Sequence, residues 1–330
     1  TPKNIPILKI SFWVVSLRQS PTETETAKQS IARAQAIRKT PIKLISCEIH
    51  GKKLICKYRH NIENRLSMKR YRIVLLTGAS SGIGKEIAYA LASQAERIVL
   101  VARRSEKIEE IARDLSLRFG VSAFALSADL SIPGEASRVF EKTVELAGDA
   151  PDLLVNDAGV GFQGKASEIP VDAECKMLRI NVESLMVLSK LALRAMEKKR
   201  RGVILNVSSM AGFQPGPYMA AYYATKAFAL SYSEALAEEA RNSHVRLLVL
   251  CPGFVDTEFH LHAGSQKGFF RCLFRSSAQS VAWEAVRAVL GGKSGIIVPG
   301  KFNKCLLFAE RFLSRRLLVK AMACILRRGK

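Results

Sequence analysis

Tyr222 and Lys226 carry the side chains best suited to proton transfer in this sequence of 330 residues. They stand four residues apart, so on a helix they share one face. A free tyrosine has a pKa near ~10 and exchanges protons poorly at neutral pH. A fixed ammonium beside it favours the tyrosinate and lowers that pKa. The spacing therefore predicts a general acid–base, although an ordinary surface helix could carry the same pair.

A glycine-rich segment offers a second kind of chemistry. It reads Thr77-Gly78-Ala79-Ser80-Ser81-Gly82-Ile83-Gly84 and follows a short apolar run. Glycines let the backbone turn tightly and approach a pyrophosphate, while the helix behind them offers unpaired N–H groups and the positive end of its dipole. Between a strand and a helix, this pattern favours dinucleotide binding over a helix start that merely uses glycine.

Two polar segments stand where predicted strands end. They are Asn156-Asp157-Ala158-Gly159 and Asn206-Val207-Ser208-Ser209. Small residues in the first let a cofactor lie close to the backbone, although the same residues also form ordinary turns.

The elements that must position these residues alternate along the chain. Apolar, β-branched runs predict seven strands, at 72–76, 97–101, 121–127, 152–155, 202–207, 245–250 and 295–298. Helical periodicity fills the intervals, at 85–94, 105–118, 135–147, 172–199, 222–241 and 278–290. This order predicts an α/β fold with a mostly parallel sheet covered by helices on both faces. Ligands bind such sheets at the carboxyl ends of the strands, where the motifs fall.

Composition excludes several classes of protein. Hydrophobic residues make up 48% and charged residues 24%, which rules out a disordered, collagen-like or disulfide-dense chain. No stretch approaches the roughly 18 apolar residues that a membrane span needs. The seven cysteines form no CxxC pair and show no metal-ligand spacing. We expect reduced thiols, no metal site and a cytoplasmic location.

The net charge of +22 sits mainly on the two flanks of the chain. Residues 1–67 carry +9 and residues 301–330 carry +8, which leaves +5 for the middle. Such a charge suits nucleic acid or anionic lipid. We expect no nucleic-acid partner, because no binding motif accompanies the charge.

Residues 1–67 look foreign to the rest. The first methionine is Met68, and only Gly51 among the 21 glycines precedes it. We expect a poorly ordered extension that is not native, with the natural start at Met68. The alternative is a basic extension with a targeting role. The remaining chain then divides into a domain at 68–300 and a tail at 301–330.

Over about residues 68–300, the chain resembles the short-chain dehydrogenase/reductase family. Four features occur in the family's order: the glycine turn, the Asn156–Gly159 segment, a serine thirteen residues before Tyr222, and the Tyr222…Lys226 pair. The resemblance implies a Rossmann-like, doubly wound fold and an NAD(P)-dependent oxidoreductase. One departure is Asp157, where the family usually has asparagine, and we expect it to perturb the support of the loop.

The resemblance implies roles for single residues. Tyr222 is the acid in reduction and the base in oxidation, and Lys226 lowers its pKa and holds the nicotinamide ribose. Ser209, which the spacing selects over Ser208, bonds the reacting oxygen, and Asn181 positions a water that links Lys226 to solvent. The implied cofactor-binding residues are Gly78, Ser80, Ser81, Gly82, Ile83, Gly84, Asp129, Leu130, Asn156, Ala158, Gly159, Tyr222, Lys226, Pro252, Gly253 and Thr257.

The choice of cofactor follows from charge. Cofactors with a free ribose 2′-hydroxyl are usually held by an acidic residue at the end of the second strand. Here Ala102 takes that place, followed by Arg103 and Arg104. Two guanidinium groups can bind a 2′-phosphate, so we predict NADP rather than NAD. A solvated helix start is the alternative reading of both arginines.

The segment between Pro252 and Ser280 suggests the substrate. It is rich in Phe and Leu, and in this family it covers the substrate. We expect a hydrophobic ketone, aldehyde or secondary alcohol, although a subunit contact or core packing explains the same composition. Family members are commonly dimers or tetramers, so we expect a homo-oligomer.

The tail at 301–330 predicts a basic amphipathic helix. It could lie on an anionic membrane, on a neighbouring subunit or on the body of the protein. The competing functions for the whole chain are a catalytically silent NADP-binding sensor and a membrane-associated scaffold on the same fold.

Overall fold

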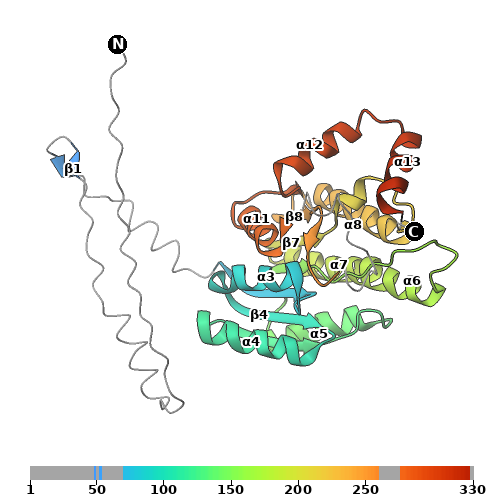
Figure 1. Ribbon diagram of the computed structural model, residues 1–330. Helices are drawn as coiled ribbons and strands as arrows, with labels where there is room; N and C mark the ends of the chain where they lie inside the picture. The colour runs from blue at the N-terminus through green and yellow to red at the C-terminus, as the bar shows by residue number, and fades with distance from the viewer. Residues whose placement is uncertain (1–47, 50–51, 54–69, 260–275, 328–330) are drawn as a thin grey trace, which may run out of the picture. The chain divides into compact units, whose positions relative to one another are not determined.

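The computed structural model describes residues 48–49, 52–53, 70–259 and 276–327 (Figure 1). The chain separates into two units, Thr1–His60 and Asn61–Lys330. In the first unit, β1 (Glu48–Ile49) pairs antiparallel with β2 (Lys52–Lys53). Most of residues 1–67 lie outside the described part, so the expected extension and the start at Met68 stay predictions. Everything below concerns the second unit.

A seven-stranded parallel sheet forms the centre of this unit. Its spatial order is β11-β8-β7-β6-β3-β4-β5, and each neighbouring pair is parallel. The strands are β3 (Tyr71–Thr77), β4 (Ala95–Ala102), β5 (Ser122–Ser127), β6 (Leu153–Asn156), β7 (Gly202–Val207), β8 (Val245–Leu250) and β11 (Gly295–Ile297). All seven predicted strands are therefore confirmed. The chain order reverses between β3 and β6, which places a crevice there.

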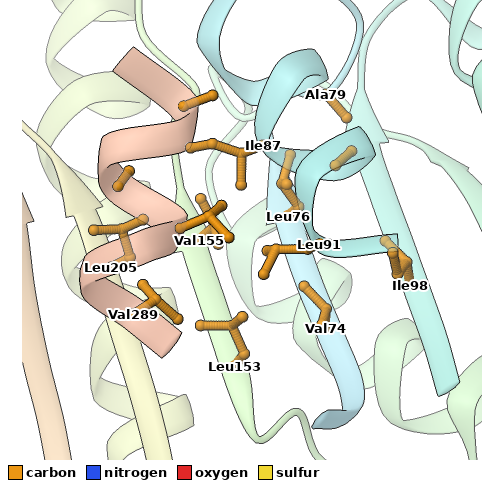
Figure 2. Packing of buried hydrophobic residues seen from close by; sticks show 14 of the residues in the cluster. Val74, Leu76, Ala79, Ile87, Leu91, Ile98, Leu153, Val155, Leu205 and Val289 are labelled. Atoms are coloured by element: carbon orange, nitrogen blue, oxygen red, sulfur yellow. The ribbon is translucent and has the colours of Figure 1, made fainter. Parts of the chain in front are cut away.

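Helices cover both faces of the sheet, as the alternating pattern predicts. One face packs α3 (Gly82–Leu91), α4 (Ser105–Phe119) and α11 (Ala278–Leu290). The other packs α5 (Glu135–Ala147), α7 (Ser184–Lys198) and α8 (Ala220–Glu239). Alternate residues of one strand serve the two faces: Val74 and Leu76 join the first layer, and Ile73 and Leu75 the second. Figure 2 shows the first layer, with Ile87 and Leu91 of α3 against Leu76 and Val155.

The long helix expected at 172–199 is interrupted. The segment forms α6 (Val171–Leu178), one π-helical stretch η2 (Arg179–Glu183) and α7. Periodicity alone does not reveal a π-helical turn, because such a turn inserts a single residue into an otherwise continuous helix. Its position matters, since it contains Asn181. A short parallel pair, β9 (Val255–Asp256) with β10 (Ser276–Ser277), was not predicted either.

The tail differs from the single helix that its periodicity predicts. It forms α12 (Lys301–Glu310) and α13 (Arg315–Leu326), with Ser314 accepting a hydrogen bond from Leu317 N at the start of α13. A serine N-cap explains the break, because it favours starting a new helix over continuing the old one. Met322 and Leu326 of α13 pack on Met219 and Tyr223 of the body. Within the described residues, no helix is long and apolar enough to cross a membrane.

Candidate active site

A cleft of about 1750 Å³ lies at the carboxyl ends of the strands, where the polar motifs converge. All but three of the candidate site residues line it. These are Gly78, Ser80, Ser81, Gly82, Ile83, Arg103, Arg104, Asp129, Leu130, Ala158, Gly159, Ser209, Tyr222, Lys226, Pro252, Gly253 and Thr257. The exceptions are Gly84, Asn156 and Asn181, which lie behind its walls.

The glycine turn between β3 and α3 requires glycine because of its backbone conformation and its close contacts. Gly78 has a φ of +73°, and a Cβ there would lie 2.8 Å from the backbone nitrogen of Ala158. A Cβ on Gly84 would lie 2.5 Å from the carbonyl oxygen of Gly78. The turn therefore brings the start of α3 against the β6 loop and places Gly82 and Ile83, at the start of α3, in the wall of the cleft. Such an arrangement suits the pyrophosphate of a dinucleotide.

Thr77 joins two of the motifs through one hydroxyl group. Its Oγ1 accepts hydrogen bonds from the backbone nitrogens of Asp157 and Ala158, each at 3.2 Å. Thr77 is 1% exposed, so no water replaces these bonds. The glycine turn and the loop after β6 are consequently held in one fixed relation.

Arg104 reaches back to the glycine turn. Its Nη2 donates to Ser80 Oγ and Ser81 Oγ, both at 2.9 Å, and its Nη1 pairs with Glu258 Oε2 at 2.7 Å. Lys107 Nζ lies 3.4 Å from the other oxygen of Glu258. Each serine hydroxyl accepts from the guanidinium and so keeps its own proton to donate. Two donors and a cation thus converge beside Ala102, where an acidic residue would hold a free ribose hydroxyl.

Asp129 and Leu130 follow β5 at the far end of the cleft. Burial raises the pKa of the Asp129 carboxyl, but hydrogen bonds from Ser131 and the charge of Arg103 outweigh it, so the pKa is lowered. Asp129 Oδ1 accepts from Ser131 N at 3.0 Å, which fixes the carboxylate.

Thr257, after β8, packs over the glycine turn. A Cβ at Gly82 would lie 3.1 Å from Thr257 Cγ2.

Tyr222 stands on α8 with Ser209 beside it. Burial raises the pKa of Tyr222 to about 12, and the Ser209 hydroxyl opposes this effect by hydrogen bonding. The Tyr222 ring lies 5.3 Å from the Phe259 ring, centroid to centroid. Gly161 permits this approach, because a Cβ there would lie 2.7 Å from Phe259 and 3.0 Å from Tyr222. Ser208 instead donates to the carbonyl oxygen of Lys226 at 2.7 Å, so Ser209 is the serine at the tyrosine.

Lys226 lies on the same side of α8 as Tyr222, as the spacing predicts. Its Nζ sits 5.9 Å from the centre of the Tyr222 ring and donates to the carbonyl oxygen of Val207 at 2.9 Å. Burial lowers the pKa of this ammonium, while the carboxyl of Asp157 opposes the change. The lowered pKa expected for Tyr222 is not found in the chain alone, because burial of the phenol and the negative charge of Asp157 both raise the pKa and outweigh the hydrogen bond with Ser209.

Asn181 occupies the π-helical stretch and faces the loop after β6. Its Oδ1 accepts from Val160 N and its Nδ2 donates to Val160 O, both at 2.9 Å. A Cβ on Gly159 would lie 3.4 Å from Lys226 Nζ and 3.5 Å from Asn181 Oδ1. The lysine and the asparagine therefore border the same point of the cleft wall, at Gly159.

The side chain of Asn156, for which a cofactor contact is expected, does not line the cleft. The residue is 4% exposed, and its Nδ2 donates to Asn206 Oδ1 at 2.9 Å and Ser189 Oγ at 3.1 Å. Asn206 in turn donates to Ser233 Oγ at 2.9 Å. The strand alternation explains this placement, because Asn156 ends β6 with its side chain toward α7, away from the cleft.

Asp157 takes part in the electrostatics of the site, which goes beyond its expected effect on the loop. Burial raises the pKa of its carboxyl, while Lys226 and the N–H of Gly84 oppose the rise. Its negative charge also raises the pKa of Tyr222. The departure from asparagine therefore adds a titratable group beside the two candidate catalytic side chains.

Three contributors were missed from the sequence. Glu258 holds Arg104, Gly161 makes room for Tyr222, and Asn303 packs within 2.8 Å of where a Gly253 Cβ would lie. Glu258 directly follows Thr257, which is the one signal that could have suggested it. The other two depend on approaches between distant segments. Of the aromatic segment after Pro252, Phe254 and Phe259 line the cleft, and residues 260–275 lie outside the described part.

The chain fits a dinucleotide on structural grounds. Its glycine cradle would be filled by any Cβ, the start of α3 opens toward it, and Arg104 with Ser80 and Ser81 forms a phosphate-sized group of donors. A family model described as short chain dehydrogenase matches residues 72–268, more than half of the chain. The chain belongs to this family. It is an NAD(P)-dependent short-chain dehydrogenase/reductase.

Individual proteins that this short-chain dehydrogenase resembles are also named as dehydrogenases or reductases. The NADP-dependent 3-hydroxy acid dehydrogenase of Schizosaccharomyces pombe is 33% identical over 205 residues, which cover 59% of this chain and 77% of that protein. Dehydrogenase/reductase SDR family member 7B of Rattus norvegicus is 28% identical, covering 77% of this chain and 81% of that protein. The solved short-chain dehydrogenase from Sphingobium yanoikuyae in complex with NADPH superposes with a TM-score of 0.65 at 26% identity, covering 78% of this chain and 98% of that one.

Proposed function

We propose that this short-chain dehydrogenase uses NADP to interconvert a hydrophobic ketone or aldehyde and the corresponding alcohol, with Tyr222 as the general acid–base. The observation that carries the proposal is the meeting of Tyr222, Ser209 and Lys226 at the wall of one cleft. The bound nicotinamide supplies the hydride in reduction and accepts it in oxidation.

The chain's own residues supply the proton and the orientation. Tyr222 donates its phenolic proton to the carbonyl oxygen, and the Ser209 hydroxyl holds that oxygen in place. Lys226 stabilises the tyrosinate that is left behind, and Asn181 lies where a bridging water would return the proton. Because the pKa of Tyr222 is about 12 in the chain alone, the phenol is protonated at neutral pH. This state suits reduction.

The preference for NADP rests on Arg104. The glycine turn and Arg104 present two serine hydroxyls and a guanidinium, which match the acceptor oxygens of a 2′-phosphate. Both the Schizosaccharomyces pombe relative and the Sphingobium yanoikuyae structure carry NADP or NADPH in their names.

Arg104→Gln should weaken the binding of NADPH by at least about tenfold and leave that of NADH within about twofold, because only NADPH carries the phosphate. Glu258→Gln should act in the opposite direction and strengthen NADPH binding, since it frees Arg104 and Lys107 from a competing carboxylate. Dissociation constants from fluorescence titration measure both effects without turnover. Equal losses for the two cofactors in Arg104→Gln would contradict the assignment.

The hydrophobic substrate is proposed from the other half of the cleft. Beyond Tyr222, its lining consists largely of apolar side chains from the segment after β8 and from the tail: Phe254, Phe259, Phe302, Leu306, Leu313 and Met322. Absorbance of NADPH with a panel of carbonyl compounds of rising chain length tests this. We expect kcat/KM to increase with the apolar size of the substrate. A preference for small polar carbonyl compounds would contradict it.

Asp157→Asn should move the pH profile. Reduction needs protonated Tyr222, so kcat falls as pH rises through the pKa of that phenol. Asp157 raises this pKa, and its removal lowers it, so the alkaline fall of kcat should shift to lower pH. Asp172→Asn is the matched control, because it removes an exposed carboxylate from the cleft rim, where solvent screens it. Identical profiles for both variants would count against a role for Asp157.

We expect the enzyme to be a homo-oligomer, and its cytoplasmic location stays a prediction.

A further inference from the structure

The two tail helices leave an unusual amount of apolar surface uncovered. Residues 301–327, here called the C-terminal arm, comprise α12, α13 and the turn between them. Eight of the sixteen exposed large apolar side chains of the described part lie in this arm. They are Phe302, Leu306, Phe308, Phe312, Leu313, Leu317, Val319 and Ile325. Figure 1 shows α12 and α13 at one side of the domain, joined by a bend.

The most exposed of these side chains form a pair. Phe308 and Phe312 are 61% and 76% exposed, and their rings contact each other with centroids 5.3 Å apart. Single exposed apolar residues are common on proteins, whereas two phenylalanines in edge-to-face contact inside a larger apolar patch mark a surface that contacts something apolar.

On α13, the apolar surface extends beyond what the body covers. Leu318, Met322 and Leu326 form the row that packs on the domain. Leu317 and Ile325, which are 57% and 42% exposed, form a second row directly beside it. This helix has more apolar surface than its contact with the domain requires.

Positive charge surrounds this surface. The arm contains seven basic residues and one acidic residue, Glu310. The basic residues are Lys301, Lys304, Arg311, Arg315, Arg316, Lys320 and Arg327, and every one of them is exposed. Within the described residues, none forms an ion pair. The arm thus presents phenylalanine and leucine side chains between basic side chains. A partner that matches it has an apolar interior and an anionic outer layer.

This charge argues against a second copy of the arm as the occupant. Packing two arms together would bring two strongly basic surfaces into contact, and like charges that meet in an interface are unfavourable. An anionic lipid bilayer satisfies both properties, because its headgroups attract the basic side chains and its acyl layer receives the rings.

The arm is also continuous with the cleft. Leu306, Leu313 and Ile325 line the cleft and are 40%, 46% and 42% exposed, so they stand at its rim. A surface seated on this arm therefore meets the opening that leads to Tyr222.

We propose that the C-terminal arm docks the enzyme onto an anionic lipid bilayer and places the rim of the cleft against it, so that an apolar carbonyl substrate passes from the lipid phase to Tyr222. The docking stands on the arm alone, and the transfer of substrate rests on the proposed function.

Sedimentation of the full chain with lipid vesicles tests the docking. We expect the partition coefficient to be at least about tenfold higher for phosphatidylcholine vesicles containing phosphatidylglycerol than for phosphatidylcholine alone, and to fall with added salt. The paired changes Phe308→Ser with Phe312→Ser, and Arg316→Glu with Lys320→Glu, should each lower it by about tenfold or more. All four side chains are exposed and none lines the cleft.

Leu117→Ser is the matched control, because Leu117 is 86% exposed on α4, outside the arm. It should bind vesicles as the unchanged chain does. Because residues 1–67 are also basic, the arm variants decide the outcome and the unchanged chain alone does not. Binding that is unaffected by both arm variants would overturn the proposal. So would arm variants that dissociate an oligomer while lipid binding stays the same.

Activity separates the docking from the proposed function. The Phe308/Phe312 variant should reduce a small water-soluble carbonyl compound at the normal rate and lose turnover of a vesicle-embedded one. If the unchanged chain binds vesicles and reduces neither compound, the proposed function fails and the docking stands.

Discussion

Tyr222→Phe should lower kcat for carbonyl reduction between about 10²- and 10⁴-fold, the range that a positioned acid contributes. The change removes one hydroxyl and keeps the ring that packs against Phe259. The binding of NADPH should therefore stay within about twofold of its normal value, since the turn and Arg104 are untouched. Single-turnover kinetics with preloaded NADPH measures the chemical step, and a fluorescence titration measures binding.

The neighbouring tyrosine provides the control for this experiment. Tyr223 follows on the same helix, also lines the cleft, and carries the same hydroxyl. Tyr223→Phe should keep kcat close to normal, because it keeps the ring that meets the Tyr222 ring at 6.0 Å between centroids, and Ser209 bonds the hydroxyl of Tyr222. If both variants react at similar rates, or if Tyr222→Phe retains more than about a tenth of normal activity, Tyr222 is not the acid.

Gly84→Ala should strongly impair both folding stability and cofactor binding. The added methyl group would lie 2.5 Å from Gly78 O and 2.6 Å from Asp157 Oδ2, and the first of these is backbone that cannot rotate away. Overpacking of this kind costs about 1–3 kcal/mol, which lowers Tm by about 2–12 °C. The start of α3 must also move off the glycine turn, so the affinity for NADPH should fall at least about tenfold.

Gly164→Ala is the matched control for that substitution. A Cβ there would lie 3.4 Å from Ile169 Cγ1, which is an ordinary contact with a side chain. Thermal unfolding and NADPH titration should both be close to normal. A Gly84→Ala protein with normal Tm and normal affinity would show that the turn does not need this glycine.

The seven strands of the central sheet could be predicted from the sequence, because each of them is a short apolar run. Val74, Leu75 and Leu76 form a continuous apolar run, and both faces of that strand are buried, as such a run predicts. The π-helical stretch at Asn181 could not be predicted, because its one inserted residue changes the backbone and leaves little trace in the apolar spacing. The tail also misled, because its periodicity continues across the Ser314 cap that divides it.

For the site, the sequence predicted which residues meet at the cleft better than it predicted the directions of their pKa shifts. Spacing placed Tyr222 and Lys226 on one side of α8, but the sign of the shift in the pKa of Tyr222 depends on burial, which spacing does not report. The direction of the Asn156 side chain, away from the cleft, could not be predicted, because a loop motif does not reveal which way its first side chain points. Glu258 escaped notice because its partners, Arg104 and Lys107, stand about 150 residues earlier in the chain.

The hydrogen-bonded group of Asn156, Asn206, Ser189 and Ser233 has a consequence for how such an enzyme can change. These buried side chains link β6 and β7 to α7 and α8. The helix α8, which carries Tyr222 and Lys226, is thus held to the sheet by bonds that do not involve the loop after β8 or the C-terminal arm. New specificities can therefore arise by exchanging those outer segments, with the reacting groups left in register.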